Sequence, residues 1–223
     1  CWLGDGRRSR ETPLNHSRLA QGMSVTEVLR ARRSCRSFSS HPLAPQAVDY
    51  LVDRARRTPT AGNSQGVEFL VLDTPETTSR YWDTTLAEIG RDAFPFPGLL
   101  RAPLLVVPFG LPDRYLDRYS EPDKAATGLG EGVEYWRVPY WLVDAAFAAM
   151  ALQMLAVESG LSCCFFGLFE HETAVRERFS APDGARAVGT VAIGYADIDT
   201  GRAGRSSGRR RRALEEVLHR GSW

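Results

Sequence analysis

The sequence predicts an α+β protein with a central mixed or antiparallel sheet flanked by helices. Helical and strand-like segments interleave along the chain, but without the regular alternation of a doubly wound α/β fold. The composition fits one folded domain, because 223 residues with 43% hydrophobic and 25% charged residues resemble an average globular protein. A formal net charge of +1 provides no overall field that would select nucleic acid or an anionic membrane.

Residues 1–22 are expected to form a flexible extension outside the fold. Arginines stand there among small and polar residues without any periodicity. Such a segment buries too little apolar surface to fold alone. Met23 follows and is a candidate translation start, so the folded domain is expected to cover residues 23–223.

The first half of the domain is expected to contain three helices and two strands. Ser24 and Glu27 have capping-box spacing, so a helix should begin there and end near Arg33 or Ser34. Pro45 suits the first turn of a second helix. The other expected segments are a loop at 60–66, a buried strand at 69–72, a helix at 75–89, and a strand at 104–107 between Pro103 and Pro108.

The second half is expected to begin with an irregular segment, residues 110–137, which is rich in Gly, Asp and Tyr. So long an irregular segment in a compact domain is often a lid or binding loop. The strongest helix follows at about 139–159, with Gly160 as its C-cap. Asp144 and Gln153 make it a better buried helix than a membrane span. A strand at 163–166, a helix at 170–179 and a last central strand at 188–193 complete the expected elements.

The cysteines indicate no metal site and no disulfide framework. Cys1, Cys35, Cys163 and Cys164 lack the spacing of either. Cys163 and Cys164 stand together in an apolar run and are expected to be small buried hydrophobic residues. A vicinal disulfide or redox pair is the alternative. The four histidines are scattered outside any recognisable metal or catalytic context, and the cysteine usage fits a reducing cytoplasm.

Three polar features far apart in the sequence favour one common ligand. They are the arginine-rich segment 32–36, the loop that contains Asn63 and Gln65, and the arginine run 209–212. Guanidinium groups bind phosphate bidentately, and paired amide groups suit the edge of a planar heterocycle. Each feature alone has a simpler explanation as a helix end, a turn or a solvated face. Their combination favours a ligand that carries a phosphate.

Segment 32–38 resembles the arginine-rich opening motif of the nitroreductase family, and segment 59–65, followed by Glu68 and Phe69, resembles that family's second motif. Segments 160–167 and 187–195 are similar to its late helix–strand–glycine segment and its last strand, and 209–217 to its basic tail. The resemblance runs from about Ser24 to His219. It implies a nitroreductase-like fold and a homodimer, in which the C-terminal extension reaches the partner subunit. The alanine-rich helix after Pro139 suits such an interface, or is simply a core helix.

The resemblance also implies an FMN site. Arg32, Arg33 and Ser34 would bind the phosphate and ribityl chain, together with Arg36 of the same motif and with Arg209 and Arg211 from the tail. Asn63 and Gln65 would lie by the flavin, and Phe166 and Gly167 would lie beside its reactive nitrogen, mainly through backbone. No catalytic side chain is expected, because FMN itself carries the hydride.

The pocket wall is expected to differ from the family pattern. Gly66 and Val67 stand where the family usually has proline and an aromatic residue, and Thr60 replaces a common serine. Tyr135 and Trp136 are expected to line an aromatic substrate pocket by stacking. By contrast, Trp141 and Phe147 are expected to pack in the core.

The function implied by the resemblance is a ping-pong oxidoreductase. NADPH or NADH would reduce FMN, which would then reduce a small aromatic or conjugated acceptor, such as a nitro compound or a quinone. An FMN-dependent dehydrogenase or oxidase of a biosynthetic pathway is a second reading, and reductive dehalogenation or flavin breakdown a distant third. A non-catalytic flavin-binding or polyanion-binding protein is the alternative from another class. The balanced net charge and the lack of a basic, aromatic stripe count against nucleic acid as a partner.

Overall fold

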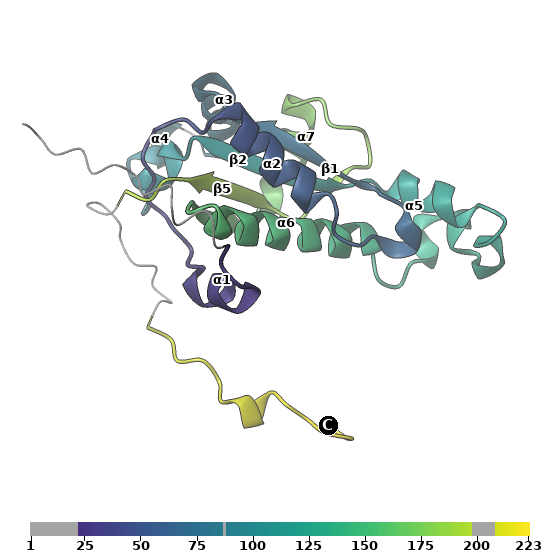
Figure 1. The fold of residues 1–223 in the computed structure, drawn as a ribbon. Coiled ribbons are helices and arrows are strands. Elements are labelled where there is room, and N and C mark those ends of the chain that lie inside the picture. Colours follow the sequence, from purple (N-terminus) through teal and green to yellow (C-terminus); the bar gives the residue numbers. More distant parts are fainter. Residues whose placement is uncertain (1–21, 87, 198–207) are drawn as a thin grey trace, which may run out of the picture.

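A computed structural model describes residues 22–86, 88–197 and 208–223 and shows an open five-stranded sheet (Figure 1). Its main strands, in spatial order, are β1 (Val67–Leu72), β2 (Leu104–Gly110), β5 (Thr190–Gly194) and β3 (Ser162–Phe166), and the short β4 (Arg186–Ala187) pairs with the end of β2. Every strand pair is antiparallel, and an isolated parallel bridge joins Ser34 to Cys163. The α+β class is therefore confirmed, with an antiparallel sheet.

Helices cover both faces of the sheet. Helices α2 (Pro45–Ala55) and α6 (Tyr140–Glu158) lie on one face, and α3 (Pro75–Thr85) and α7 (Glu172–Arg178) lie on the other (Figure 1). Because side chains alternate along a strand, Leu104 and Val106 of β2 pack in the core under α2 and α6. Leu105 and Val107 pack in the core on the other face, under α3 and α7. Burial of each such side chain contributes about 1.5–3 kcal/mol, so β2 ties the two layers together.

Helix α1 (Val25–Ala31) begins as expected and ends earlier. Ser24 and Glu27 form the predicted capping box. The helix stops before Arg32, whose backbone is extended with φ −53° and ψ 122°. The chain then runs to β3, where the Cys35 N–H donates to the Cys163 carbonyl at 2.8 Å. The expected end near Arg33 or Ser34 was wrong, because this contact with the sheet edge takes the motif out of the helix.

Two further boundaries differ from the expectations. Helix α3 ends at Thr85 rather than Ile89, because Leu86 is extended with φ −144°, and a separate short helix α4 (Glu88–Arg91) follows. Strand β2 continues through Pro108 to Gly110. Pro108 lies between the stretch paired with β5 and the stretch paired with β4, where the ladder on that side is interrupted. A proline is tolerated at such a break because its missing N–H leaves no gap in a continuous ladder.

The segment expected to be irregular contains a helix and three short turns. Helix α5 (Pro112–Tyr119) is followed by 3₁₀ turns at Ala125–Thr127, Leu129–Glu131 and Val133–Tyr135. Together they project beyond one end of the sheet (Figure 1). Tyr115, Trp136 and Trp141 form a small core of their own there. This tertiary packing stabilises a helix that the local sequence pattern did not reveal.

Helix α6 is the one helix in the described residues that is long and apolar enough to cross a membrane. It packs across β2, β3 and β5 and against α2, which is the position of a core helix. Gly160, with φ 74°, ends it as predicted, and the Leu161 N–H donates to the Ala156 carbonyl at 2.8 Å. Trp141 is buried as expected, but Phe147 is 47% exposed on the outer face of the helix, so its expected core position was wrong.

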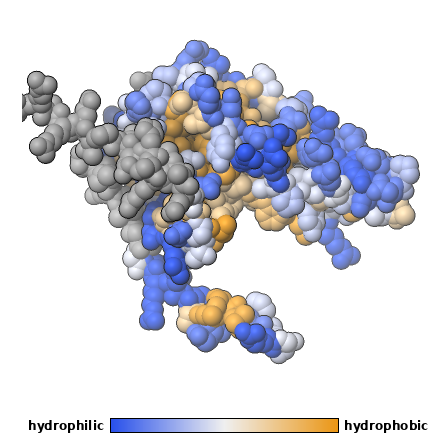
Figure 2. Space-filling model, in the orientation of Figure 1, coloured by the Kyte–Doolittle hydropathy of each residue, from blue (hydrophilic) through white to orange (hydrophobic). Residues whose placement is uncertain are grey.

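The C-terminal segment 208–223 is exposed along its whole length and holds one 3₁₀ turn, Leu214–Glu216. Its hydrophobic side chains Leu214, Val217 and Leu218 are exposed. Figure 2 shows orange, hydrophobic surface on the lowest part of the molecule. The expected N-terminal extension lies outside the described residues apart from Gly22.

Candidate functional site

Three arginines of the segment after α1 carry charge that no carboxylate of the described residues neutralises. The Arg33 guanidinium donates to the carbonyls of Arg30 and Arg32, at 2.5 and 3.0 Å. The Arg36 guanidinium lies 5.1 Å from the centre of the Phe96 ring. Among the described residues, neither these two nor Arg32 has an ion-pair partner. The edge of β3 therefore carries a concentrated positive potential that would attract an anion.

A cavity of about 280 Å³ lies beside the end of β3. Arg36, Phe166 and Gly167 line it, so the structure brings together three of the predicted site residues. The rest of the wall is largely apolar and includes Tyr81, Trp82, Phe94, Phe96 and Leu99. Trp82 stacks on Phe166 with ring centres 5.7 Å apart and an interplanar angle of 18°. The cavity combines an apolar interior with a guanidinium at its border, which suits a flat ring linked to an anionic group.

Backbone forms part of the cavity wall, because two glycines allow close approach there. A Cβ at Gly189 would lie 2.5 Å from the Phe166 carbonyl oxygen, and Gly189 has φ 145°. A Cβ at Gly167 would lie 3.0 Å from the exposed ring of Phe169. Larger residues would therefore disturb the chain around Phe166. That Phe166 and Gly167 act mainly through backbone stays a prediction.

Three free thiols lie where the arginine motif meets β3. Cys163 and Cys164 are buried and Cys35 is partly buried. Burial raises the pKa of the Cys163 thiol to about 11, and it also raises the pKa of Cys35 and of Cys164. All three are protonated at neutral pH, and a thiol is a weak nucleophile. Cys163 and Cys164 are thus small buried hydrophobic residues, as predicted.

The loop that carries Asn63 and Gln65 has an unusual backbone. Gly62, Asn63 and Gln65 have φ angles of 62°, 55° and 51°. Asparagine tolerates this left-handed region, whereas glutamine seldom adopts it. The Thr60 hydroxyl accepts the Gln65 N–H at 2.9 Å and closes the loop. Such strain persists only where the surroundings impose it, and it concentrates at functional sites.

The surroundings that impose this conformation come from α5 and α6. Asp144, which is 2% exposed, accepts the Ala61 N–H at 2.8 Å and the Tyr115 hydroxyl at 2.8 Å. The Arg118 Nε donates to the Gly62 carbonyl at 2.8 Å. Sequence reasoning did not assign these anchors. The available signal was an aspartate in the first half of a largely apolar helix, because a buried carboxylate must find hydrogen-bond partners.

Tyr115 also gives a physical reason for one departure from the family pattern. Gly66 is buried, and a Cβ there would overlap the Tyr115 ring and lie 3.0 Å from the Arg114 Cβ. A proline at position 66 would meet the same ring. Gly66 therefore allows α5 to pack closely against this loop.

The loop and the arginine motif lie on opposite edges of the sheet. Asn63 and Gln65 precede β1, whereas Phe166 ends β3 and Arg36 lines the cavity beside it. Three strand spacings separate these edges, which amounts to roughly 14 Å. One chain therefore does not bring the two predicted halves of the site together. Within the described residues, Arg209 and Arg211 are exposed and have no bond to the rest of the chain.

A cavity of about 580 Å³ lies in the projecting segment and is lined by Ala61, Tyr135, Trp136 and Tyr140, among others. Trp136 is 8% exposed, and its indole N–H donates to the Leu129 carbonyl at 2.9 Å. Its ring packs edge-on against neighbouring aromatic rings. Tyr135 is exposed at the same cavity. Trp136 therefore holds the segment together, and Tyr135 has the more accessible ring.

Comparison with known proteins gives a consistent result. The family model described as "Nitroreductase family" matches residues 29–195. A nitroreductase family protein from Clostridium difficile is similar in structure, with a TM-score of 0.62 and 20% identity over 90% of this chain and 100% of that chain. An FMN-dependent nitroreductase from the same species has a TM-score of 0.61 and 19% identity, over 88% of this chain and 98% of that chain. A protein assigned as a nitroreductase from Exiguobacterium sibiricum, solved in complex with FMN, has a TM-score of 0.65 and 18% identity, over 89% of this chain and 98% of that chain.

Proposed function

Because the chain belongs to the nitroreductase family of FMN-dependent oxidoreductases, we propose that it passes hydride from NADPH or NADH through FMN to a small acceptor. An aromatic or conjugated acceptor, such as a nitro compound or a quinone, suits this chemistry. One observation carries the proposal. The arginines of the motif, which have no counter-ions within the described part of the chain, adjoin an apolar cavity lined by Arg36, Phe166 and Gly167.

The residues present fit the phosphate end of FMN. Arg32, Arg33 and Ser34 offer guanidinium and hydroxyl donors at the sheet edge, and no described carboxylate competes for those guanidinium groups. Charge-assisted hydrogen bonds of this kind contribute about 1.5–3 kcal/mol each. Arg209 and Arg211 would add to them when the C-terminal segment folds over the site.

The residues present also fit the ring end. The walls around Phe166 are largely apolar, and Phe166 and Gly167 both line the cavity, so a flat ring would pack there. FMN, when bound, supplies the hydride chemistry, and the protein supplies orientation and charge. Arg36 at the border of the cavity would hold negative charge that develops near the ring.

The complete site in this proposal needs two chains, because Asn63 and Gln65 lie on the far edge of the sheet. The outer face of α6 supports a homodimer: Phe147 is exposed, and Met150 and Met154 near it are partly exposed. An apolar helix face of this kind is typical of a subunit interface. Asn63 and Gln65 of one chain would then meet the flavin of the other, with Tyr135 beside the acceptor.

The experiment that tests the proposal is the absorption spectrum of the purified protein with FMN, before and after anaerobic addition of NADPH or NADH. A bound-flavin spectrum that bleaches supports the proposal and opens a screen of acceptors. Bound flavin that does not bleach favours an FMN-dependent dehydrogenase or a non-catalytic flavoprotein. No bound flavin contradicts the proposal and favours a polyanion as the partner of the arginines.

A further inference from the structure

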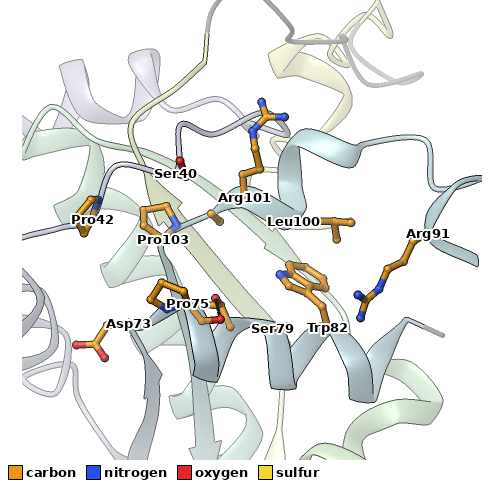
Figure 3. Close-up of a pocket in the computed structure, with 12 residues that line it drawn as sticks. Ser40, Pro42, Asp73, Pro75, Ser79, Trp82, Arg91, Leu100, Arg101 and Pro103 are labelled. Atoms are coloured by element: carbon orange, nitrogen blue, oxygen red, sulfur yellow. Dashed lines mark hydrogen bonds between the residues drawn. The ribbon is translucent and has the colours of Figure 1, made fainter. Parts of the chain in front are cut away.

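A second cavity, of about 300 Å³, lies between α3 and the 3₁₀ segment Pro97–Arg101 (Figure 3). Its apolar walls come from Pro42, Pro75, Leu100 and Pro103. Trp82 lines both this cavity and the one beside Phe166. The volume lies at the lower end of the range of small-molecule sites, about 300–1,000 Å³, so the cavity suits a small ligand.

Two buried hydrogen-bond donors at this cavity have no acceptor in the part of the chain that the structure describes. Trp82 is 6% exposed, and its indole N–H has no partner among the described residues. Figure 3 shows the indole nitrogen directed into the space between Pro75, Leu100 and Pro103. The buried Nε–H of Arg91, which also lines the cavity, has no partner either. Buried donors are nearly always paired in folded proteins, so each such atom points to an acceptor that completes it.

The location of these donors is selective. Four buried side-chain polar atoms lack a partner within the described residues, and two of them line this one cavity. The other two are the Ser64 Oγ and the Trp141 indole nitrogen, and neither lines this cavity. The cavity between α3 and Pro97–Arg101 therefore holds two donors that a ligand could pair.

One charged donor at the cavity suits an anion. Arg91 pairs with Asp83 through Nη2, which leaves its Nε–H for a ligand. The carboxylate of Asp73 points away from the cavity in Figure 3. The first turns of α3 also contribute to the wall, and the positive end of a helix dipole favours negative charge.

We propose that this cavity binds a small organic carboxylate. Its oxygens would accept from the Trp82 indole N–H and the Arg91 guanidinium, and its hydrocarbon part would pack against Pro75, Leu100 and Pro103. The site is separate from the proposed FMN site and does not rest on it. Trp82 links the two, because the same indole stacks on Phe166.

The test is a titration of the ¹⁵N-labelled full chain, saturated with FMN, with sodium isobutyrate. This aliphatic carboxylate has no ring that could stack on a flavin. The indole N–H signals are assigned with Trp82→Phe and Trp141→Phe variants. We expect the Trp82 signal to move downfield and to saturate, and the Trp141 signal to stay in place. Isobutyramide, which is neutral and similar in shape, should bind at least about tenfold more weakly.

A matched pair of variants tests the role of the charge. Arg91→Met should weaken isobutyrate binding by about tenfold or more. Arg80→Met, which removes a surface arginine of α3 paired with Glu76, should leave the affinity unchanged. If Arg91→Met does not fold, Arg91→Lys keeps the charge, removes the Nε–H and should give an intermediate affinity.

Several results would overturn the proposal. One is a Trp82 signal that stays in place at every isobutyrate concentration, with or without a cross-peak to a long-lived water, since an ordered water alone would then satisfy the donor. Equal responses to isobutyrate and isobutyramide would be another. A change confined to the flavin absorbance would place the carboxylate at the flavin instead.

Discussion

Asp144 accepts the backbone N–H of Ala61 at 2.8 Å, across 83 positions of sequence. The same carboxylate oxygen accepts the Tyr115 hydroxyl at 2.8 Å. One buried group on α6 therefore fixes the loop that carries Asn63 and Gln65 and the helix that leads into the projecting segment. The position of that loop depends on a residue far from it in sequence.

Replacement of Asp144 by alanine should destabilise the protein, because one buried donor and one partly buried donor lose their acceptor. We expect the free energy of unfolding to fall by about 2–4 kcal/mol in urea titrations. Asp117→Ala, which removes an exposed carboxylate of α5, should change it by less than about 0.5 kcal/mol. Equal stabilities of the two variants would show that the Asp144 contacts contribute little.

Replacement of Arg32 by alanine should weaken FMN binding at little cost in stability. Its guanidinium has no ion pair to lose within the described part of the chain. We expect the dissociation constant for FMN, measured by quenching of flavin fluorescence, to rise about tenfold or more. Arg57→Ala, which removes a surface arginine paired with Asp53 on α2, is the control and should bind FMN normally.

Replacement of Phe147 by glutamate should shift the proposed dimer towards monomer. A charge in an apolar interface loses its hydration without gaining a partner. Light scattering coupled to gel filtration measures the change in mass at several protein concentrations. Tyr50→Glu, at an exposed position of α2, is the matched control. A Phe147→Glu protein that remains fully dimeric would remove this face of α6 from the interface.

Alkaline pH should destabilise the protein through its buried thiols. Burial raises the pKa of Cys163 to about 11 in the folded protein, whereas an unfolded cysteine has a pKa near 8.5. The unfolded chain therefore loses its proton first, so the stability is fully present below about pH 8.5 and falls as pH rises towards 11.

By pH 10 the ionisation of Cys163 in the unfolded chain should lower the free energy of unfolding by about 2 kcal/mol. Urea titrations of the wild type and of Cys163→Ala at pH 7.5, 8.5, 9.5 and 10 measure it. The variant should show the shallower decline. Parallel declines would mean that other groups, such as the buried Tyr81, dominate the alkaline loss.

The elements with strong local signals were predictable from the sequence. The capping box at Ser24, the proline start at Pro45 and the glycine end at Gly160 all stand where local chemistry requires them. Residues 110–137 show the limit of such signals. Helix α5 is stabilised by a small aromatic core around Tyr115, and that core forms only when residues distant in sequence come together.

The sequence motifs indicated which residues form the candidate site, but they did not indicate how these residues are arranged in space. Arg36, Phe166 and Gly167 share a cavity although about 130 positions separate the motif from β3, because the sheet topology brings them together. The separation of Asn63 from them follows from strand order, which no local pattern encodes. The outward position of Phe147 was missed because an apolar residue on an apolar helix gives no indication of which face is covered.

The strand order has a consequence for mixed populations of chains. If each active centre takes its arginines from one subunit and Asn63 from the other, a chain damaged at Arg32 and a chain damaged at Asn63 are both inactive alone. In a mixed dimer of these two chains, one active centre contains both defective residues and the other contains neither. One of the two centres is therefore intact. Co-expression of the two variants would then restore up to half of the activity per mixed dimer, and a recessive lesion at one edge of the sheet would complement a lesion at the other.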